Sequence, residues 1–93
     1  MKPVLVTTKY RGVFFGYLNE EPNGPGKLVL KAARNCLYWS ADVKGFLGLA
    51  AAGPTENCRI GPQVERITLY GITSITPVAA EAVAKWEEAP WKA

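Results

Sequence analysis

"ERITLYGITSIT", residues 65–76, is the stretch of the sequence that indicates the fold most clearly. Its isoleucines, threonines and tyrosine are typical of a β-strand, because such side chains pack well on a pleated surface. The alternating pattern breaks at Gly71, and an isolated glycine inside a strand commonly marks a bulge or a bend. We therefore expect an extended segment that changes its strand partner at Gly71.

Four further segments have the composition of short β-strands and are bounded by turn-forming residues. They are residues 3–8, 12–18, 27–31 and 34–39, and Ala32 and Ala33 link the last two. Residues 46–52, "FLGLAAA", fit either a strand or a short helix, because glycines before, inside and after the segment weaken both. We favour an extended conformation for this segment.

Residues 12–18, "GVFFGYL", carry apolar side chains on both faces of a strand. Alternation places Val13, Phe15 and Tyr17 on one face and Phe14 and Leu18 on the other. Such a strand is either covered on both sides within the chain or presents one face to another chain. Together with Trp86 and Trp91 near the C-terminus, this pattern predicts a homo-oligomer.

The final segment predicts a helix over about residues 77–89. Thr76 is a suitable N-cap, and Pro77 suits the first helical position, where a backbone N–H has no partner in any case. Apolar side chains then follow helical spacing at Val78, Ala82, Val83 and Trp86, and Pro90 ends the helix.

These segments together predict a mainly β fold of the α+β class. We expect a small antiparallel sheet or half-barrel of five to six strands with one C-terminal helix. The length of 93 residues suits a single domain, 1–93, with a β-rich body over residues 3–76.

The composition argues against several classes of function. The sequence has no histidine, so it offers no Ser-His-Asp or Cys-His nucleophile, and two cysteines do not make a four-ligand zinc site within one chain. We therefore expect no metal, no cofactor and no enzymatic activity; an enzyme would have to use Cys58 as nucleophile beside Arg59. Cys36 and Cys58 are interpreted as free, partly buried thiols, as expected in a reducing compartment; the alternative is a disulfide, which requires Cα atoms within about 7 Å.

Net charge and hydropathy indicate the expected cellular location and the expected classes of partner. The eleven basic residues are scattered and the net charge is only +3, so nucleic acid is an unfavoured partner. No apolar run approaches the ~18 residues of a membrane span, and the N-terminus does not resemble a secretory signal. We expect a cytoplasmic protein without a membrane partner.

Residues 48–55, "GLAAAGPT", approach the spacing of a phosphate-binding loop but lack its lysine. Pro54 occupies the lysine position, which removes both the positive charge and one backbone N–H. A nucleotide-hydrolysing loop is therefore rejected.

Aromatic, basic and polar side chains in two segments form the candidate ligand site. Arg34, Tyr38 and Trp39 lie in "RNCLYW" (34–39), and Thr55, Asn57 and Arg59 lie in "GPTENCRIGP" (53–62). Arginine binds phosphate in a bidentate manner, and tyrosine and tryptophan stack on planar groups. The set predicts a pocket for a nucleotide-like ligand, with Arg34 and Arg59 on its phosphate. The alternative is that the aromatic residues belong to the core and that Arg59 pairs with Glu56 or Glu65.

The chain also resembles a known family. "YRGVFFGYL", "ARNCLYWSADVKGFLGLAAAGPTENCRIGPQV", "ITLYGITSI" and "AVAKWEEAPW" are similar to a small family of proteins of unknown function in tailed bacteriophages and prophages. The resemblance runs from about Val4 to Trp91 and supplies no catalytic residues. It implies a phage origin, an accessory role and expression in a bacterial cytoplasm.

Two functions follow as expectations. The first is a homo-oligomeric phage-type protein that sequesters a phosphorylated small ligand, such as an immune-signalling nucleotide, and so counters host defence. This expectation rests on the analogy that small phage proteins often act by stoichiometric binding. The alternative is an interaction or structural module that binds a host or phage protein through residues 12–18 and the Trp86/Trp91 end, without a small ligand.

Overall fold

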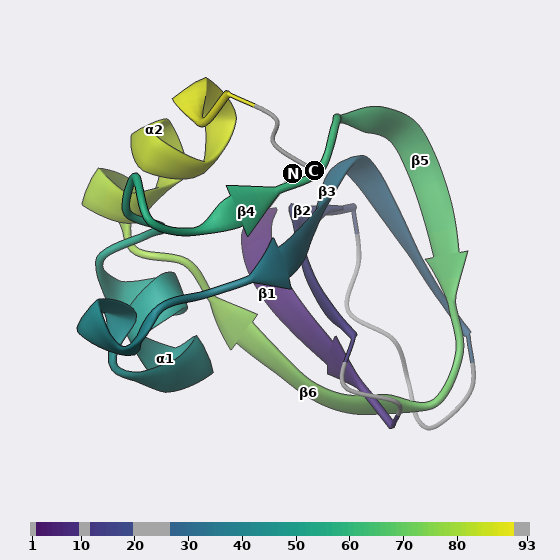
Figure 1. Cartoon of the computed structure of the whole chain (residues 1–93). Helices are drawn as coiled ribbons and strands as arrows, with labels where there is room; N and C mark the ends of the chain where they lie inside the picture. The colour runs from purple at the N-terminus through teal and green to yellow at the C-terminus, as the bar shows by residue number, and fades with distance from the viewer. Residues whose placement is uncertain (1, 10–11, 20–26, 91–93) are drawn as a thin grey trace.

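The computed structural model describes residues 2–9, 12–19 and 27–90 of the chain, and Trp91 therefore lies outside the described residues (Figure 1). It is an α+β fold, mainly β, with a six-stranded antiparallel sheet and two α-helices. The strands are β1 (Lys2–Thr8), β2 (Val13–Leu18), β3 (Leu28–Tyr38), β4 (Arg59–Ile60), β5 (Val64–Leu69) and β6 (Ile72–Pro77). The helices are a 3-10 turn, η1 (Ala41–Val43), and α1 (Gly45–Ala51) and α2 (Ala80–Glu88). The predicted fold class is confirmed.

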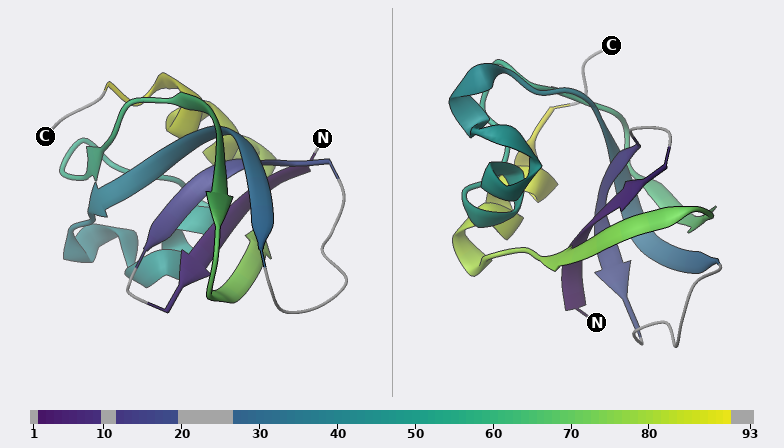
Figure 2. Two further views of the ribbon diagram at one scale, coloured as in Figure 1. Left: turned by 90° about the vertical axis from the view of Figure 1, so that its right-hand side faces the viewer. Right: turned by 90° about the horizontal axis from the view of Figure 1, so that it is seen from below.

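The sheet is built around the long strand β3. The strand order is β4-β3-β2-β1-β6, and β5 also pairs with β3, so that β4 and β5 lie along different parts of one strand. Figure 2 shows the sheet curving strongly, with both α-helices on one side of it. No helix in the described part of the chain is long and apolar enough to cross a membrane.

Strand β3 unites two segments that the sequence predicted as separate strands. Its pairing with β2 shifts register between Phe15 and Tyr17, because β3 carries one extra residue there. Ala32 lies within this bulge and has a left-handed backbone, with φ of 50°. A bulge lets a strand continue past an irregular residue, so the two predicted strands join.

The predicted change of partner at Gly71 is confirmed. β5 pairs with β3, whereas β6 pairs with β1. Between them Gly71 has φ of +66°, a conformation that glycine adopts readily because it lacks a Cβ.

The extended conformation favoured for residues 46–52 is wrong, because Gly45–Ala51 form α1. Leu49 and Ala50 are buried and Phe46 is half-buried, which is helical spacing. Glycine is required at position 48 because the backbone of Val43 packs too closely for a Cβ, and not because of the conformational freedom of glycine. A Cβ at this position would lie 1.6 Å from the carbonyl oxygen of Val43.

The helix at the C-terminus is confirmed, but its predicted start is wrong. Thr76 and Pro77 belong to β6, where Pro77 pairs with Val4 of β1. Helix α2 begins at Ala80, and its N-cap residue Ala79 makes no side-chain capping hydrogen bond. The backbone N–H of Ala79 instead donates to the carbonyl oxygen of Ala50 at 2.9 Å. Pairing with a distant strand therefore outweighs the local capping signal.

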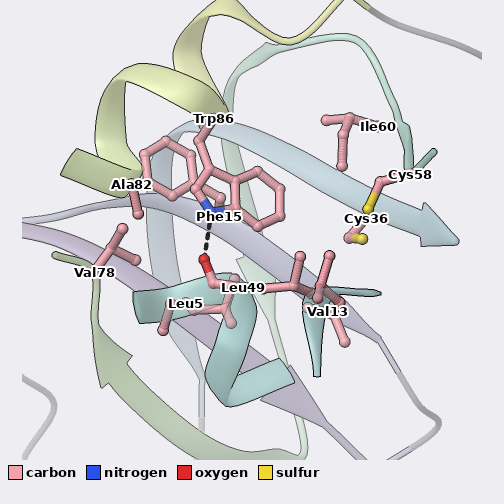
Figure 3. Close-up of a cluster of buried hydrophobic side chains, with 12 residues drawn as sticks. Leu5, Val13, Phe15, Cys36, Leu49, Cys58, Ile60, Val78, Ala82 and Trp86 are labelled. Carbon is pink, nitrogen blue, oxygen red and sulfur yellow. Dashed lines mark hydrogen bonds between the residues drawn. The ribbon is translucent and has the colours of Figure 1, made fainter. Parts of the chain in front are cut away.

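Two hydrophobic clusters fill the two faces of the sheet. The first, between the sheet and the helices, includes Leu5, Val13, Phe15, Cys36, Leu49, Cys58, Ile60, Ala82 and Trp86 (Figure 3). Within it Phe15 stacks on Trp86, with ring centroids 5.2 Å apart, and the Trp86 indole donates a hydrogen bond to the Leu49 carbonyl at 3.0 Å. The second cluster contains residues of strands alone: Val4, Val6, Leu18, Leu28, Leu30, Ala33 and Leu69.

The two clusters settle how β2 is covered. Val13 and Phe15 belong to the first cluster, Leu18 belongs to the second, and Phe14 packs against the second. Both faces of the strand are therefore covered within one chain. The argument that β2 requires another subunit no longer holds, and the homo-oligomer stays a prediction.

Candidate functional site

A groove of about 410 Å³ lies beside Trp39, one of the predicted site residues. We call it the Trp39 groove. It is lined by Thr7 and Thr8 of β1, Gly12 and Val13 at the start of β2, Trp39 after β3, Phe46 of α1 and Thr73 of β6. The aromatic side chains of Trp39 and Phe46 are half-buried and pack against the first hydrophobic cluster, which holds them in place.

The lining of this groove also includes the hydroxyl-bearing residues Thr7, Thr8 and Thr73. The Thr7 hydroxyl lies 2.7 Å from that of Thr73 and 2.5 Å from that of Ser74, across the pairing of β1 with β6. The Thr8 hydroxyl accepts a hydrogen bond from the backbone N–H of Gly12 at 3.2 Å. Each hydroxyl can both donate and accept, and so retains capacity for a ligand. The described lining is uncharged and combines aromatic surface with hydroxyls, which suits a planar ligand with a polar edge.

Arg34 does not face this groove. Its side chain is 5% exposed, and its guanidinium is bonded to three main-chain carbonyl oxygens. Nε donates to Gly61 at 2.9 Å, and Nη1 donates to Trp86 at 2.9 Å and to Ala89 at 2.5 Å. Burial lowers the pKa of Arg34 from its ordinary value, although arginine remains charged in proteins. Arg34, which the sequence predicted to bind phosphate, instead joins β3 to the C-terminal end of α2.

Tyr38 and Arg59 lie opposite each other where β3 pairs with β4. Tyr38 is 53% exposed and Arg59 is exposed as well, so this pair faces solvent. Strand β4 was not predicted from the sequence. It has only two residues, and so short a strand shows no alternating pattern. The backbones of the two residues pair, but neither residue lines the Trp39 groove.

Thr55 and Asn57 belong to a tight turn before β4. The backbone N–H of Cys58 donates to the Thr55 carbonyl at 3.0 Å, and that of Asn57 donates to the Thr55 hydroxyl at 3.3 Å. The Asn57 amide also donates to Asp42 at 3.3 Å, and the Ser40 hydroxyl bonds to the other oxygen of the same carboxylate. These bonds, with that of Ser40 foremost, lower the pKa of Asp42. The turn is therefore held against η1 by side-chain hydrogen bonds.

The six predicted residues thus occupy four places rather than one pocket. Only Trp39 lines the Trp39 groove. The groove residues that the sequence did not single out are Thr7, Thr8, Phe46 and Thr73. Threonines in strands carry no local signal of a site, and the pairing that brings β6 beside β1 is not visible in the sequence.

Comparison with known proteins places the chain in a family. The family profile with the description "Domain of unknown function (DUF6948)" matches residues 1–86. Neither the curated proteins nor the solved structures contain a match to the chain. Because the profile covers nearly all of its 93 residues, the chain belongs to the family of the domain of unknown function DUF6948.

Proposed function

We propose that the protein is a stoichiometric binding protein that captures a nucleotide-like ligand, with the planar base of the ligand in the Trp39 groove. The observation that carries the proposal is the composition of this groove, in which two aromatic residues and three threonines line about 410 Å³. Drug-sized ligands occupy pockets of roughly 300–1,000 Å³. The space therefore suits a base, or a base with its sugar.

The chemistry of the lining favours a ring with polar edges. Stacking on an aromatic side chain contributes about 1–3 kcal/mol per base, and every base offers a π-face. The hydroxyls of Thr7, Thr8 and Thr73 can bond the ring edge or sugar hydroxyls. A phosphate of such a ligand would project from the groove, because Arg34 is bonded to carbonyl oxygens and Arg59 does not line it.

The biological role belongs to the same proposal. The sequence resembles small proteins of tailed bacteriophages, and a phage protein that sequesters an immune-signalling nucleotide would counter host defence. Sequestration needs only a binding site, which the Trp39 groove would supply. A homo-oligomer stays part of the proposal, and light scattering at tens of micromolar protein tests that part separately.

Calorimetry with nucleobases, nucleosides and cyclic and linear nucleotides is the direct test. We expect at least one class to bind, and Trp39→Ala to weaken its binding roughly 5- to 150-fold, as loss of one stacking face predicts. Thr73→Tyr, which fills the groove from an exposed position, should also weaken binding. Tyr70→Ala is the matched control, because Tyr70 is 69% exposed and lies outside the groove. A folded protein that binds none of the panel, or binds equally well in both groove variants, would refute the proposal.

A second candidate, recognition of a partner protein, now relies on other residues than the sequence suggested. Trp86 is buried and both faces of β2 pack against the hydrophobic clusters, whereas Leu37 and Leu47 are 51% and 61% exposed. Pull-down with the wild type, Leu37→Ser and Trp39→Ala distinguishes the two candidates. A partner lost with Leu37→Ser but retained with Trp39→Ala would favour this candidate over the groove.

A further inference from the structure

The two cysteines lie in one buried cluster although 22 positions separate them in the sequence. Cys36 is 5% exposed and Cys58 is 3% exposed, and both are free thiols in the first hydrophobic cluster. In Figure 3 the two sulfur atoms occupy the same region of the core, next to Ile60. The sequence alone left open whether the two thiols meet, and the fold brings them into one cluster.

Strand pairing explains how they come together. Cys36 pairs with Ile60, and Tyr38 pairs with Arg59, so Cys58 lies just beyond that second pair towards the C-terminal end of β3. The Cys36 thiol points in this direction, because its sulfur lies 3.6 Å from the Tyr38 carbonyl oxygen. The register shift between Cys36 and Tyr38 places an extra residue in β3 at this point. The two thiols therefore occupy diagonal positions across a short strand pair.

We propose that Cys36 and Cys58 form a redox pair, which an oxidising small disulfide converts into an intramolecular disulfide bond between β3 and the turn before β4. Diagonal neighbours on antiparallel strands have Cα atoms about 7–8 Å apart, whereas disulfides need about 4.4–6.8 Å. The turn before β4 would have to move towards β3 by roughly an ångström or two. This turn is held by the hydrogen bonds of Thr55 and Asn57 rather than by a long strand pair, so the required movement is local.

The chemistry balances as two thiol–disulfide exchanges with oxidised glutathione as the oxidant. The Cys58 thiolate attacks one glutathione sulfur, forms a mixed disulfide and expels one glutathione thiolate, which takes up a proton. The Cys36 thiolate then attacks the Cys58 sulfur, forms the Cys36–Cys58 bond and expels the second glutathione thiolate. Two electrons pass to glutathione, and the protons of both thiols end on its two reduced molecules.

The order of the two steps follows from the surroundings of Cys36. Burial first, and the nearby Cys58 second, raise the pKa of Cys36 to about 12. Cys36 is thus a poor first nucleophile, because the thiolate is the reactive form. It is suited to the second step, in which the attacked sulfur is already adjacent.

The new bond would close a loop that contains η1 and α1. This loop carries both Trp39 and Phe46, the aromatic residues of the Trp39 groove. Closing a loop of this length restricts the unfolded chain and is expected to raise Tm by about 10 °C. The proposal does not depend on the proposed ligand, since thiols and thermal stability are measured without it.

Treatment of the folded, reduced protein with excess oxidised glutathione is the test. We expect both thiols to disappear in a titration under denaturing conditions, the intact mass to fall by two hydrogens, and a non-reducing peptide map to show a Cys36–Cys58 link. Tm should rise, and a reductant should reverse the rise. Cys36→Ser and Cys58→Ser are matched controls, in which no rise should occur. Two retained thiols, stable glutathione adducts, a disulfide-linked dimer, or a linked chain without a higher Tm would each overturn the proposal.

Discussion

Replacing Arg34 with methionine should destabilise the protein by about 3 kcal/mol. Methionine keeps much of the aliphatic packing but removes all three hydrogen bonds to the carbonyl oxygens of Gly61, Trp86 and Ala89. A buried hydrogen bond to a charged group contributes roughly 1.5–3 kcal/mol, so that the three bonds together contribute about 4.5–9 kcal/mol. Burying the guanidinium costs several kcal/mol, which methionine avoids, and this leaves a loss of about 3 kcal/mol.

The loss is large for a protein of this size. At about 0.05–0.15 kcal/mol per residue, the whole free energy of unfolding is roughly 5–14 kcal/mol. Arg34 also lies at the C-terminal end of α2, where a positive charge interacts favourably with the partial negative charge of the helix end. We therefore expect Arg34→Met to loosen α2 from the sheet before other parts of the structure.

Urea unfolding at neutral pH measures the effect. With an m value of about 1–3 kcal/mol/M, the midpoint of Arg34→Met should fall by about 1–3 M. Arg34→Lys keeps the charge but not the planar fork of donors, and its urea midpoint should lie between those of Arg34→Met and the wild type. Arg59→Met is the matched control, because Arg59 is exposed, and should change stability by less than about 0.5 kcal/mol. A loss below about 1 kcal/mol in Arg34→Met would refute the assigned role.

Three further predictions concern β2 and β3. Gly16→Ala should destabilise by about 1–3 kcal/mol in urea unfolding, because its Cβ would lie 2.4 Å from the Leu30 side chain; unchanged stability would contradict this packing. Ala32→Gly should stabilise by about 0.5–1 kcal/mol, since glycine relieves the left-handed backbone at φ of 50°; a lower midpoint would argue against the bulge. Burial, and then the hydrogen bond to Glu87, raise the pKa of Tyr17 to about 12. Tyrosine in the unfolded chain ionises near pH 10, so Tyr17 should contribute stability that is lost as the pH rises from about 10 to 12. Tyr17→Phe should lose less stability than the wild type over that range, and equal losses would contradict the assignment.

The fold could be predicted where local patterns dominate. Alternation around Gly71 located the change of partner, and the apolar spacing before Pro90 located the final helix. The predicted secondary structure was wrong where contacts with distant segments determine the backbone conformation. The packing of Gly48 against Val43 favours a helix in a glycine-containing segment, and pairing with β1 extends β6 through Pro77.

The candidate site was harder to predict for the same reason. Arginine is a good ligand for phosphate, but no sequence pattern shows that Arg34 meets carbonyl oxygens of Gly61, Trp86 and Ala89. Trp39 was singled out from its residue type, and it is the predicted residue that lines the Trp39 groove. Its partners in the groove, Thr7 and Thr73, come together only through strand pairing between opposite ends of the sequence.

The pairing of β1 with β6 also determines the order in which the chain can fold during its synthesis. Strand β1 emerges from the ribosome first, but one of its edges stays unpaired until β6 has been made. An open edge of this kind is a template for pairing with other chains, and sheets that depend on distant partners form slowly. Nascent chains that stop before Ile72 would therefore expose this edge, and such chains are prone to aggregate until β6 has been added.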